Sequence, residues 1–404
     1  MTIDPNPLQK RLFFSYQILG LALIVFFGPM MARQIYTSPD FIDHIQTARI
    51  MLEQGTVLKS HFLFHVLSIL FYGIIKGLGG SFPGAAFLTQ MVALLALGSI
   101  LFFIVHSNFP TDVSWKGFFL KIVFTLSLMI ITPFHLFSLP SHELYLGYVG
   151  ITVYHSPTMT LLKPLALLSV LYVLKIFHPP ARGNSLWAVL ILAVLVAVSA
   201  LAKPSFLICL LPALFLIAVI FLFKKRRLDW RMIFAGVVIP SLLLLWWQYS
   251  FTYSHPEDGT RGIIFAPLEV IRLHSQWLLP KLMLSILFPL YIAIAYFKDV
   301  LRDLSLRFAW LMFFIGIFYQ YFLAETGYRF GHGNFFWSAQ ITLFILFVFS
   351  FVFLLHQSEK ASGDILAGPW SRKFIIGLIL FAAHVGCGLI WYATQITDRP
   401  YGWW

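Results

Sequence analysis

The chain has 404 residues, of which 59% are hydrophobic, 18% are aromatic and only 11% are charged. Soluble proteins usually carry about 25% charged residues, so this chain lacks the polar surface that a soluble enzyme, a disordered scaffold or a secreted disulfide module would need. The mean hydropathy of +0.84 predicts one all-α polytopic membrane domain over residues 1–404. The formal net charge of +12 comes from short basic clusters between apolar runs, a pattern typical of membrane proteins rather than of nucleic-acid-binding proteins.

Apolar runs long enough to cross a bilayer, about 20 residues each, recur along the whole chain. No small-residue cleavage site follows the first run, so we expect a retained first helix rather than a signal peptide. The twelve candidate runs are residues 12–32, 61–79, 84–106, 117–138, 158–177, 186–202, 204–223, 232–252, 282–298, 305–323, 335–356 and 373–395.

Basic residues set the expected orientation of these runs. The strongest cluster, within residues 224–231, should be cytoplasmic. If all twelve runs crossed, the N-terminus would have to lie outside, which Lys10 and Arg11 oppose. The run 61–79, which contains two histidines and a lysine, is the weakest candidate, and we expect it to lie at the outer interface as an amphipathic helix. About eleven spans then remain, with the N-terminus cytoplasmic and the C-terminus outside.

In this orientation the acidic residues and histidines collect in the outer segments, whereas the inner loops are short and mostly basic. The two sizeable outer pieces are residues 33–83, with interfacial helices, and residues 253–281. We therefore expect any chemistry on the outer face.

The first outer loop carries a compact acidic cluster. Pro39 and Asp40 suit the start of a helix, and Asp40 and Asp43 fall in its first turn, where carboxylates complement the helix dipole. The spacing of i, i+3 and i+4 places Asp40, Asp43 and His44 on one face of that helix. Two interpretations stay open: helix capping with a solvated face, or a general base with its orienting partner.

Two lysines lie in or between apolar runs, where a buried charge costs free energy but could also hold an anion. Lys163 falls about one turn into an apolar run, where an unpaired ammonium costs about 2.5–3.5 kcal/mol, so it should face a polar cavity or snorkel. Lys203, followed by Pro204, lies between two runs at the outer face. It is either an interfacial turn residue or a point charge that holds a phosphate. His155, which precedes the run containing Lys163, is a candidate for binding a sugar or an acceptor.

The segment from Glu325 to Asn334 combines charge with glycine. It holds three glycines within seven residues, which let the backbone approach a ligand closely. Arg329 could bind a phosphate through two parallel hydrogen bonds. Glu325 could orient that arginine or, with His332 and Asn334, bind sugar hydroxyls; an ordinary loop between helices is the alternative.

The remaining polar residues give weaker signals. Arg261 and Arg272, in the 253–281 loop, are further candidates for binding phosphate. His61 and His65 have the i, i+4 spacing of a metal-chelating pair. No cysteine or carboxylate completes a ligand set nearby, so interfacial histidines are favoured and no metal site is predicted.

The order of features in the first outer loop resembles the GT-C superfamily of membrane glycosyltransferases that use polyprenyl-phosphate sugars. In that family a spanning helix leads into an outer loop with an acidic residue near its start. A small residue and a glycine follow on an interfacial helix, and a second interfacial helix precedes the next span. Asp40, Ala48 and Gly55 stand in this order, and the run 61–79 fits the second interfacial helix.

The Lys203–Pro204 pair and the segment 153–164 also resemble features of bacterial members of that superfamily. The resemblance implies an inverting transferase of the bacterial inner membrane, which moves a sugar from a polyprenyl-phosphate donor to a glycan, lipid or protein acceptor at the outer face. Asp40 would take the acceptor's proton, tuned by Asp43 or His44. The cations implied for the donor phosphate are Lys203, Arg329, Arg261, Arg272 and Lys163.

No cofactor is required for this chemistry, although a divalent cation could bind beside the two acids. Membrane lipids and subunits of a membrane complex are the other expected partners, and no nucleic acid is expected. Two alternatives stay open: a non-catalytic GT-C-like subunit of a larger complex, and a polymerase or flippase component for lipid-linked glycans. A transporter is disfavoured because the spans are apolar in their middles.

Overall fold

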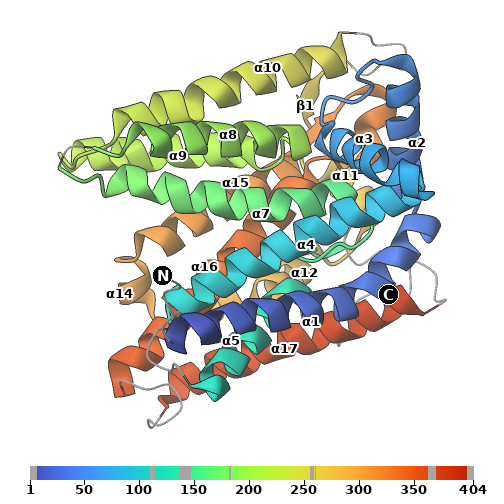
Figure 1. The fold of residues 1–404 in the computed structure, drawn as a ribbon. Helices are drawn as coiled ribbons and strands as arrows, with labels where there is room; N and C mark the ends of the chain where they lie inside the picture. Colours follow the sequence, from blue (N-terminus) through green and yellow to red (C-terminus); the bar gives the residue numbers. More distant parts are fainter. Residues whose placement is uncertain are drawn as a thin grey trace.

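The structure of the protein is a computed structural model that describes residues 7–109, 114–135, 147–181, 183–254, 259, 261–362 and 370–397. Long helices run side by side across Figure 1, and shorter elements lie at their ends. The long helices are α1 (Pro7–Thr37), α4 (Phe82–Ser107), α5 (Trp115–Ile130), α7 (Pro157–Leu174), α8 (Leu186–Ala202), α9 (Leu207–Phe223), α10 (Ile239–Tyr253), α15 (Leu304–Phe322), α16 (Phe336–Ser362) and α17 (Arg372–Ile396).

The shorter elements complete the chain between these helices. A π-helical segment, η3, leads directly into α10, and a broken pair, α12 and α13, precedes α14. The short helices are α2 (Pro39–Gln54), α3 (Leu63–Ile75), η1 (Lys76–Leu78), η2 (Lys175–Phe177), η3 (Met232–Val238), α11 (Glu269–His274), α12 (Leu278–Ser285), α13 (Leu287–Ala295), α14 (Phe297–Val300) and η4 (Gly327–His332). A two-stranded antiparallel sheet joins β1 (Ile263–Phe265) to β2 (Leu323–Glu325).

The chain is an all-α protein with helices of the length and composition found in integral membrane proteins. Among the described residues, seven helices are long and apolar enough to cross a membrane, or eight if α12 and α13 form one bent span. The sequence predicted eleven spans. The other three runs form α5, with 16 residues, and α8 and α9, with 17 residues each, which are short for this role.

Prolines explain why two apolar runs are shorter or more broken as helices than their sequences suggest. Pro133 disfavours the helical conformation at Thr132, and α5 ends at Ile130. Pro289 lies in the first turn of α13, where its ring would clash with the carbonyl of Ser285 if the helix continued. The chain breaks there, and α12 and α13 meet at an angle of 69°.

The run at residues 61–79 was predicted not to cross. It forms α3, a helix of 13 residues that packs against α2 and α4. Figure 1 shows α2 and α3 at one end of the long helices, which we call the α2 end, together with β1. The helix α1 begins at the opposite end, and α17 finishes at the α2 end.

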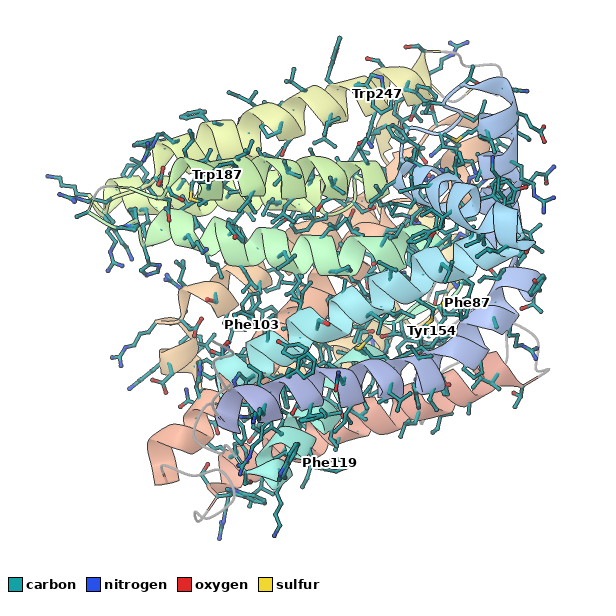
Figure 2. The ribbon with its side chains drawn as sticks, in the orientation of Figure 1. Phe87, Phe103, Phe119, Tyr154, Trp187 and Trp247 are labelled. Carbon is teal, nitrogen blue, oxygen red and sulfur yellow. The ribbon has the colours of Figure 1, made fainter. Side chains whose placement is uncertain are left out.

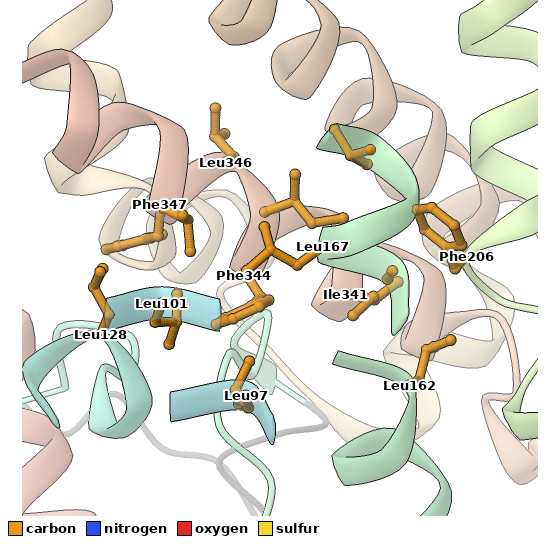
Figure 3. Packing of buried hydrophobic residues seen from close by; sticks show 14 of the residues in the cluster. Leu97, Leu101, Leu128, Leu162, Leu167, Phe206, Ile341, Phe344, Leu346 and Phe347 are labelled. Atoms are coloured by element: carbon orange, nitrogen blue, oxygen red, sulfur yellow. The ribbon is translucent and has the colours of Figure 1, made fainter. Parts of the chain in front are cut away.

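The core is built around α16. Its most apolar stretch is entirely buried, as expected for a helix that is hydrophobic on all sides. Figure 3 shows Phe344 and Phe347 of α16 among Leu101 of α4, Leu128 of α5 and Leu167 of α7, all fully buried. By contrast α1, α10 and α17 keep broad apolar faces exposed, where a bilayer would cover them.

One close helix contact depends on a glycine. Gly388 of α17 lies against the end of α5, and a Cβ added there would lie 1.9 Å from the carbonyl oxygen of Ile130. Small residues allow such close approach between membrane helices. Only glycine fits at this position.

Candidate functional site

A cavity of about 280 Å³ lies at the α2 end, between the α8–α9 junction, α10, and the sheet with η4. Its wall is mainly apolar with a few convergent polar groups, as is typical of ligand sites. Four of the predicted site residues line it, namely Lys203, Glu325, Arg329 and Asn334. The other polar or aromatic side chains of the wall include Ser60, His61, Gln248, Tyr249, Thr252, Tyr253 and Trp337.

Lys203 is positioned by the end of α8. Because proline follows it, Lys203 is driven into an extended conformation, with φ −168° and ψ 132°, and the helix stops. Its Nζ donates a hydrogen bond to Thr158 Oγ1 at 3.2 Å and lies 4.0 Å from the centre of the Trp337 ring. Burial lowers the pKa of Lys203 to about 8, and the charge of Asp40 opposes that shift. The lysine is therefore a cation near neutral pH.

Asp40 lies in the first turn of α2, which begins at Pro39 after the extended residue Ser38. Burial raises the pKa of Asp40, whereas the positive charge of Lys203 lowers it. The weaker effects of Asp43 and Lys59 act in opposite directions. The two groups therefore sense each other electrostatically, although no salt bridge joins Asp40 to Lys203 and Asp40 is not part of the cavity wall.

The predicted partners of Asp40 are engaged elsewhere. Asp43 is exposed and forms a salt bridge with Lys59. His44 is buried, and its Nδ1 lies 2.9 Å from Nε2 of His65 on α3. Within the described part of the chain, no hydrogen bond joins either side chain to Asp40.

His44 and His65 form a buried pair, and the half-buried His61, which lines the cavity, lies beside His44. Ring centroids of His44 and His61 lie 6.2 Å apart. Burial lowers the pKa of all three residues, to about 4 for His65 and about 3 for His61. These histidines are consequently neutral at pH 7, and one of the pair His44–His65 donates to the other.

Glu325 connects the residues on the side of the cavity formed by the sheet and η4. This buried carboxylate ends β2, where it stands opposite Ile263 of β1. It accepts hydrogen bonds from Tyr253 Oη at 2.7 Å, from Arg329 Nε at 3.0 Å and from Asn334 Nδ2. The carboxylate thus fixes Arg329 through Nε. The other guanidinium nitrogens make no hydrogen bond to the described residues and can meet a ligand.

The remaining predicted residues lie outside the cavity wall. Arg261, Arg272 and His332 are exposed. Lys163 is buried within α7, with its Nζ 5.0 Å from the centre of the Phe344 ring.

His155 is also buried, behind the cavity. Its ring centroid lies 6.1 Å from that of Trp337, which lines the cavity. Burial lowers its pKa to about 3, and the charge of Lys203 adds to that shift. His155 is therefore a neutral residue that supports Trp337 rather than a group in the wall.

Several wall residues were not predicted as site residues. Gln248 of α10 donates from Nε2 to the carbonyls of Ser60, at 3.0 Å, and Ala200, at 2.8 Å, which ties α10 to the first loop and to α8. Gln248 falls in the apolar run 232–252, which resembled an ordinary span, and Tyr253 follows that run directly. His61 carried a signal, its i, i+4 spacing to His65, but the interpretation favoured interfacial histidines.

The described residues do not contain a group of three or more His, Cys, Asp or Glu side chains arranged as metal ligands. Of the two acids of the first outer loop that were considered for a divalent cation, Asp43 is already engaged by Lys59. No protein-family model matches the chain, and no curated protein matches it.

Proposed function

We propose that the protein is a membrane glycosyltransferase that moves a sugar from a polyprenyl-phosphate donor to an acceptor at the α2 end. The observation that carries this proposal is the convergence of Lys203 and Arg329 on one cavity, with Asp40 close enough to Lys203 for each to shift the other's pKa. An anion site beside a carboxylate is what such a transfer requires.

The phosphate of the donor would meet Lys203 and the free nitrogens of Arg329. As the glycosidic bond breaks, negative charge grows on the leaving phosphate, and fixed cations in a partly buried site stabilise it. Glu325 keeps Arg329 in place. Asp40 would take the proton from the acceptor hydroxyl, and its raised pKa makes it a stronger base than an exposed aspartate.

The experiment uses the full chain in lipid nanodiscs, with a panel of radiolabelled undecaprenyl-phosphate sugars and bacterial membrane extracts as acceptor. Replacing Asp40 by Asn should lower transfer at least about 100-fold, the range of a lost general base, while undecaprenyl phosphate still binds. Replacing Lys203 by Ala should weaken that binding.

The matched control is Glu53→Gln, which removes an exposed acid near the end of the same helix, α2. It should leave transfer unchanged. Undiminished transfer by the folded Asp40→Asn variant would remove Asp40 from the mechanism. Normal binding of undecaprenyl phosphate without transfer from any donor would instead indicate a non-catalytic subunit.

A further inference from the structure

A second pocket, of about 430 Å³, lies at the end of the molecule opposite the cavity. Two loops form it, one between η2 and α8 and the other between α9 and η3. Its polar lining is dominated by Arg226, Arg227 and Arg231, together with Asp229 and Trp230. The proposed transfer reaction uses none of these residues.

Asp229 joins the two loops and is itself buried. Its Oδ2 accepts hydrogen bonds from the backbone N–H of Asn184 at 2.8 Å and from Asn184 Nδ2 at 3.0 Å. Its Oδ1 accepts from the N–H of Met232 at 3.2 Å. The carboxylate is thus occupied in holding the pocket, and it offsets only one of the three arginine charges.

The arginines are placed around the pocket rather than paired off. All three are exposed, and no salt bridge links them to an acid among the described residues. Arg231 Nη2 donates to the carbonyl of Asn184 at 3.0 Å. Gly183, at φ +77°, leaves room for this contact, because a Cβ added there would lie only 2.7 Å from Arg231 Nη2.

Exposed apolar side chains adjoin the basic pocket. Phe223 is 85% exposed and Trp187 73% exposed, and Figure 2 shows Trp187 near this end of the helices. Leu222 and Trp230, which line the pocket, are also exposed. Exposed tryptophans beside basic residues mark the headgroup level of a bilayer, with acyl chains lying along the apolar surface.

We propose that this pocket binds the headgroup phosphate of an anionic phospholipid. The guanidinium groups hold the phosphate by charge-assisted hydrogen bonds, and the acyl chains lie against the apolar surface of α8 and α9. Basic pockets between membrane helices recognise anionic headgroups in this way. The adjoining apolar surface favours a lipid over free phosphate, and the inference holds whichever leaflet this end faces.

The test is native mass spectrometry of the full chain released from nanodiscs that contain equal amounts of dioleoyl phosphatidylglycerol and dioleoyl phosphatidylcholine. The wild-type protein should retain phosphatidylglycerol preferentially. The double variant Arg226→Gln, Arg227→Gln should lose at least about tenfold of that retention, equivalent to about 1.4 kcal/mol.

The control is Lys224→Gln, Lys225→Gln, which removes the same charge from the same loop at two exposed residues outside the pocket wall. It should change retention less than about twofold. Gly183→Ala, which displaces the Arg231 guanidinium without changing any charge, should also reduce retention.

Equal losses in the two double variants would overturn the proposal, because diffuse charge would then explain binding. A competition with 10 mM inorganic phosphate distinguishes the two ligands, because weak anion sites bind in about the millimolar range. If phosphate displaced the lipid, the pocket would be a site for free phosphate instead. The proposal would likewise be refuted if the Gly183→Ala variant and the Arg226→Gln, Arg227→Gln variant both retained phosphatidylglycerol as fully as the wild type.

Discussion

The pH dependence of lipid-phosphate binding tests Lys203 most directly. Burial lowers the pKa of this lysine to about 8, so the free protein loses the cation as the pH rises through that value. A guanidinium keeps its charge over this whole range. We therefore expect wild-type binding to weaken at alkaline pH, and binding by Lys203→Arg to persist.

The size of the effect follows from the fraction of protein that carries the charge. With a pKa of about 8, the protonated fraction falls from about 0.9 at pH 7 to about 0.1 at pH 9, and the apparent Kd rises by the inverse of that fraction, about tenfold. The phosphate monoester loses its second proton near pH 6, at about one unit below this window, so its own charge changes little.

The assay is titration of undecaprenyl phosphate into nanodisc-bound protein at pH 7 and pH 9. Lys203→Arg should bind within about twofold at the two pH values, whatever its absolute affinity. Lys59→Arg serves as the control, because Lys59 pairs with Asp43 outside the cavity wall, and it should keep the wild-type tenfold change. If the affinity of Lys203→Arg also fell tenfold between pH 7 and pH 9, Lys203 would not be the cation whose titration weakens binding.

Three further predictions concern stability, each measured by chemical or thermal unfolding in detergent. Gly388→Ala should destabilise the protein by about 3 kcal/mol or more because a Cβ would overlap the α5 carbonyl, whereas Gly386→Ala, with open space around it, should be nearly neutral. Glu325→Gln should cost about 1–3 kcal/mol because three donors lose their charged acceptor. His65 stays neutral in the folded state down to about pH 4, whereas the unfolded chain takes up a proton near pH 6.5. His65 should therefore contribute a loss of up to about 3 kcal/mol as the pH drops from 6.5 to 4, in addition to the losses from His44 and His61, whose pKa values burial also lowers. His65→Gln should show a shallower fall.

Composition and charge predicted the all-α membrane class and the short helix at residues 61–79. Those signals are strong because a bilayer requires long apolar helices and because cytoplasmic loops carry an excess of Lys and Arg. Helix length was predicted less well. Pro133 and Pro289 interrupt runs whose hydropathy alone suggested continuous spans, since hydropathy does not register a missing backbone N–H.

Four of the predicted site residues line one cavity. Lys203 follows α8, and Glu325, Arg329 and Asn334 lie in the segment between α15 and α16 at the same end of the molecule. Tertiary contacts place other predicted site residues away from the cavity wall. His44 shares a helix face with Asp40 by spacing, but it is buried against His65 of a neighbouring helix. The wall residues of α10 sit in an apolar run whose polar members gave no local signal, and only packing reveals their role.

The mutual influence of Asp40 and Lys203 couples proton uptake at one group to anion binding at the other. In the proposed reaction, a phosphate arriving at Lys203 would cancel much of the field that holds a proton away from Asp40, so the carboxylate would become more basic as the donor docked. Linkage would make this effect reciprocal: a donor that binds at Lys203 would bind more tightly when Asp40 is protonated. Substrate arrival would itself prepare the group that accepts the proton.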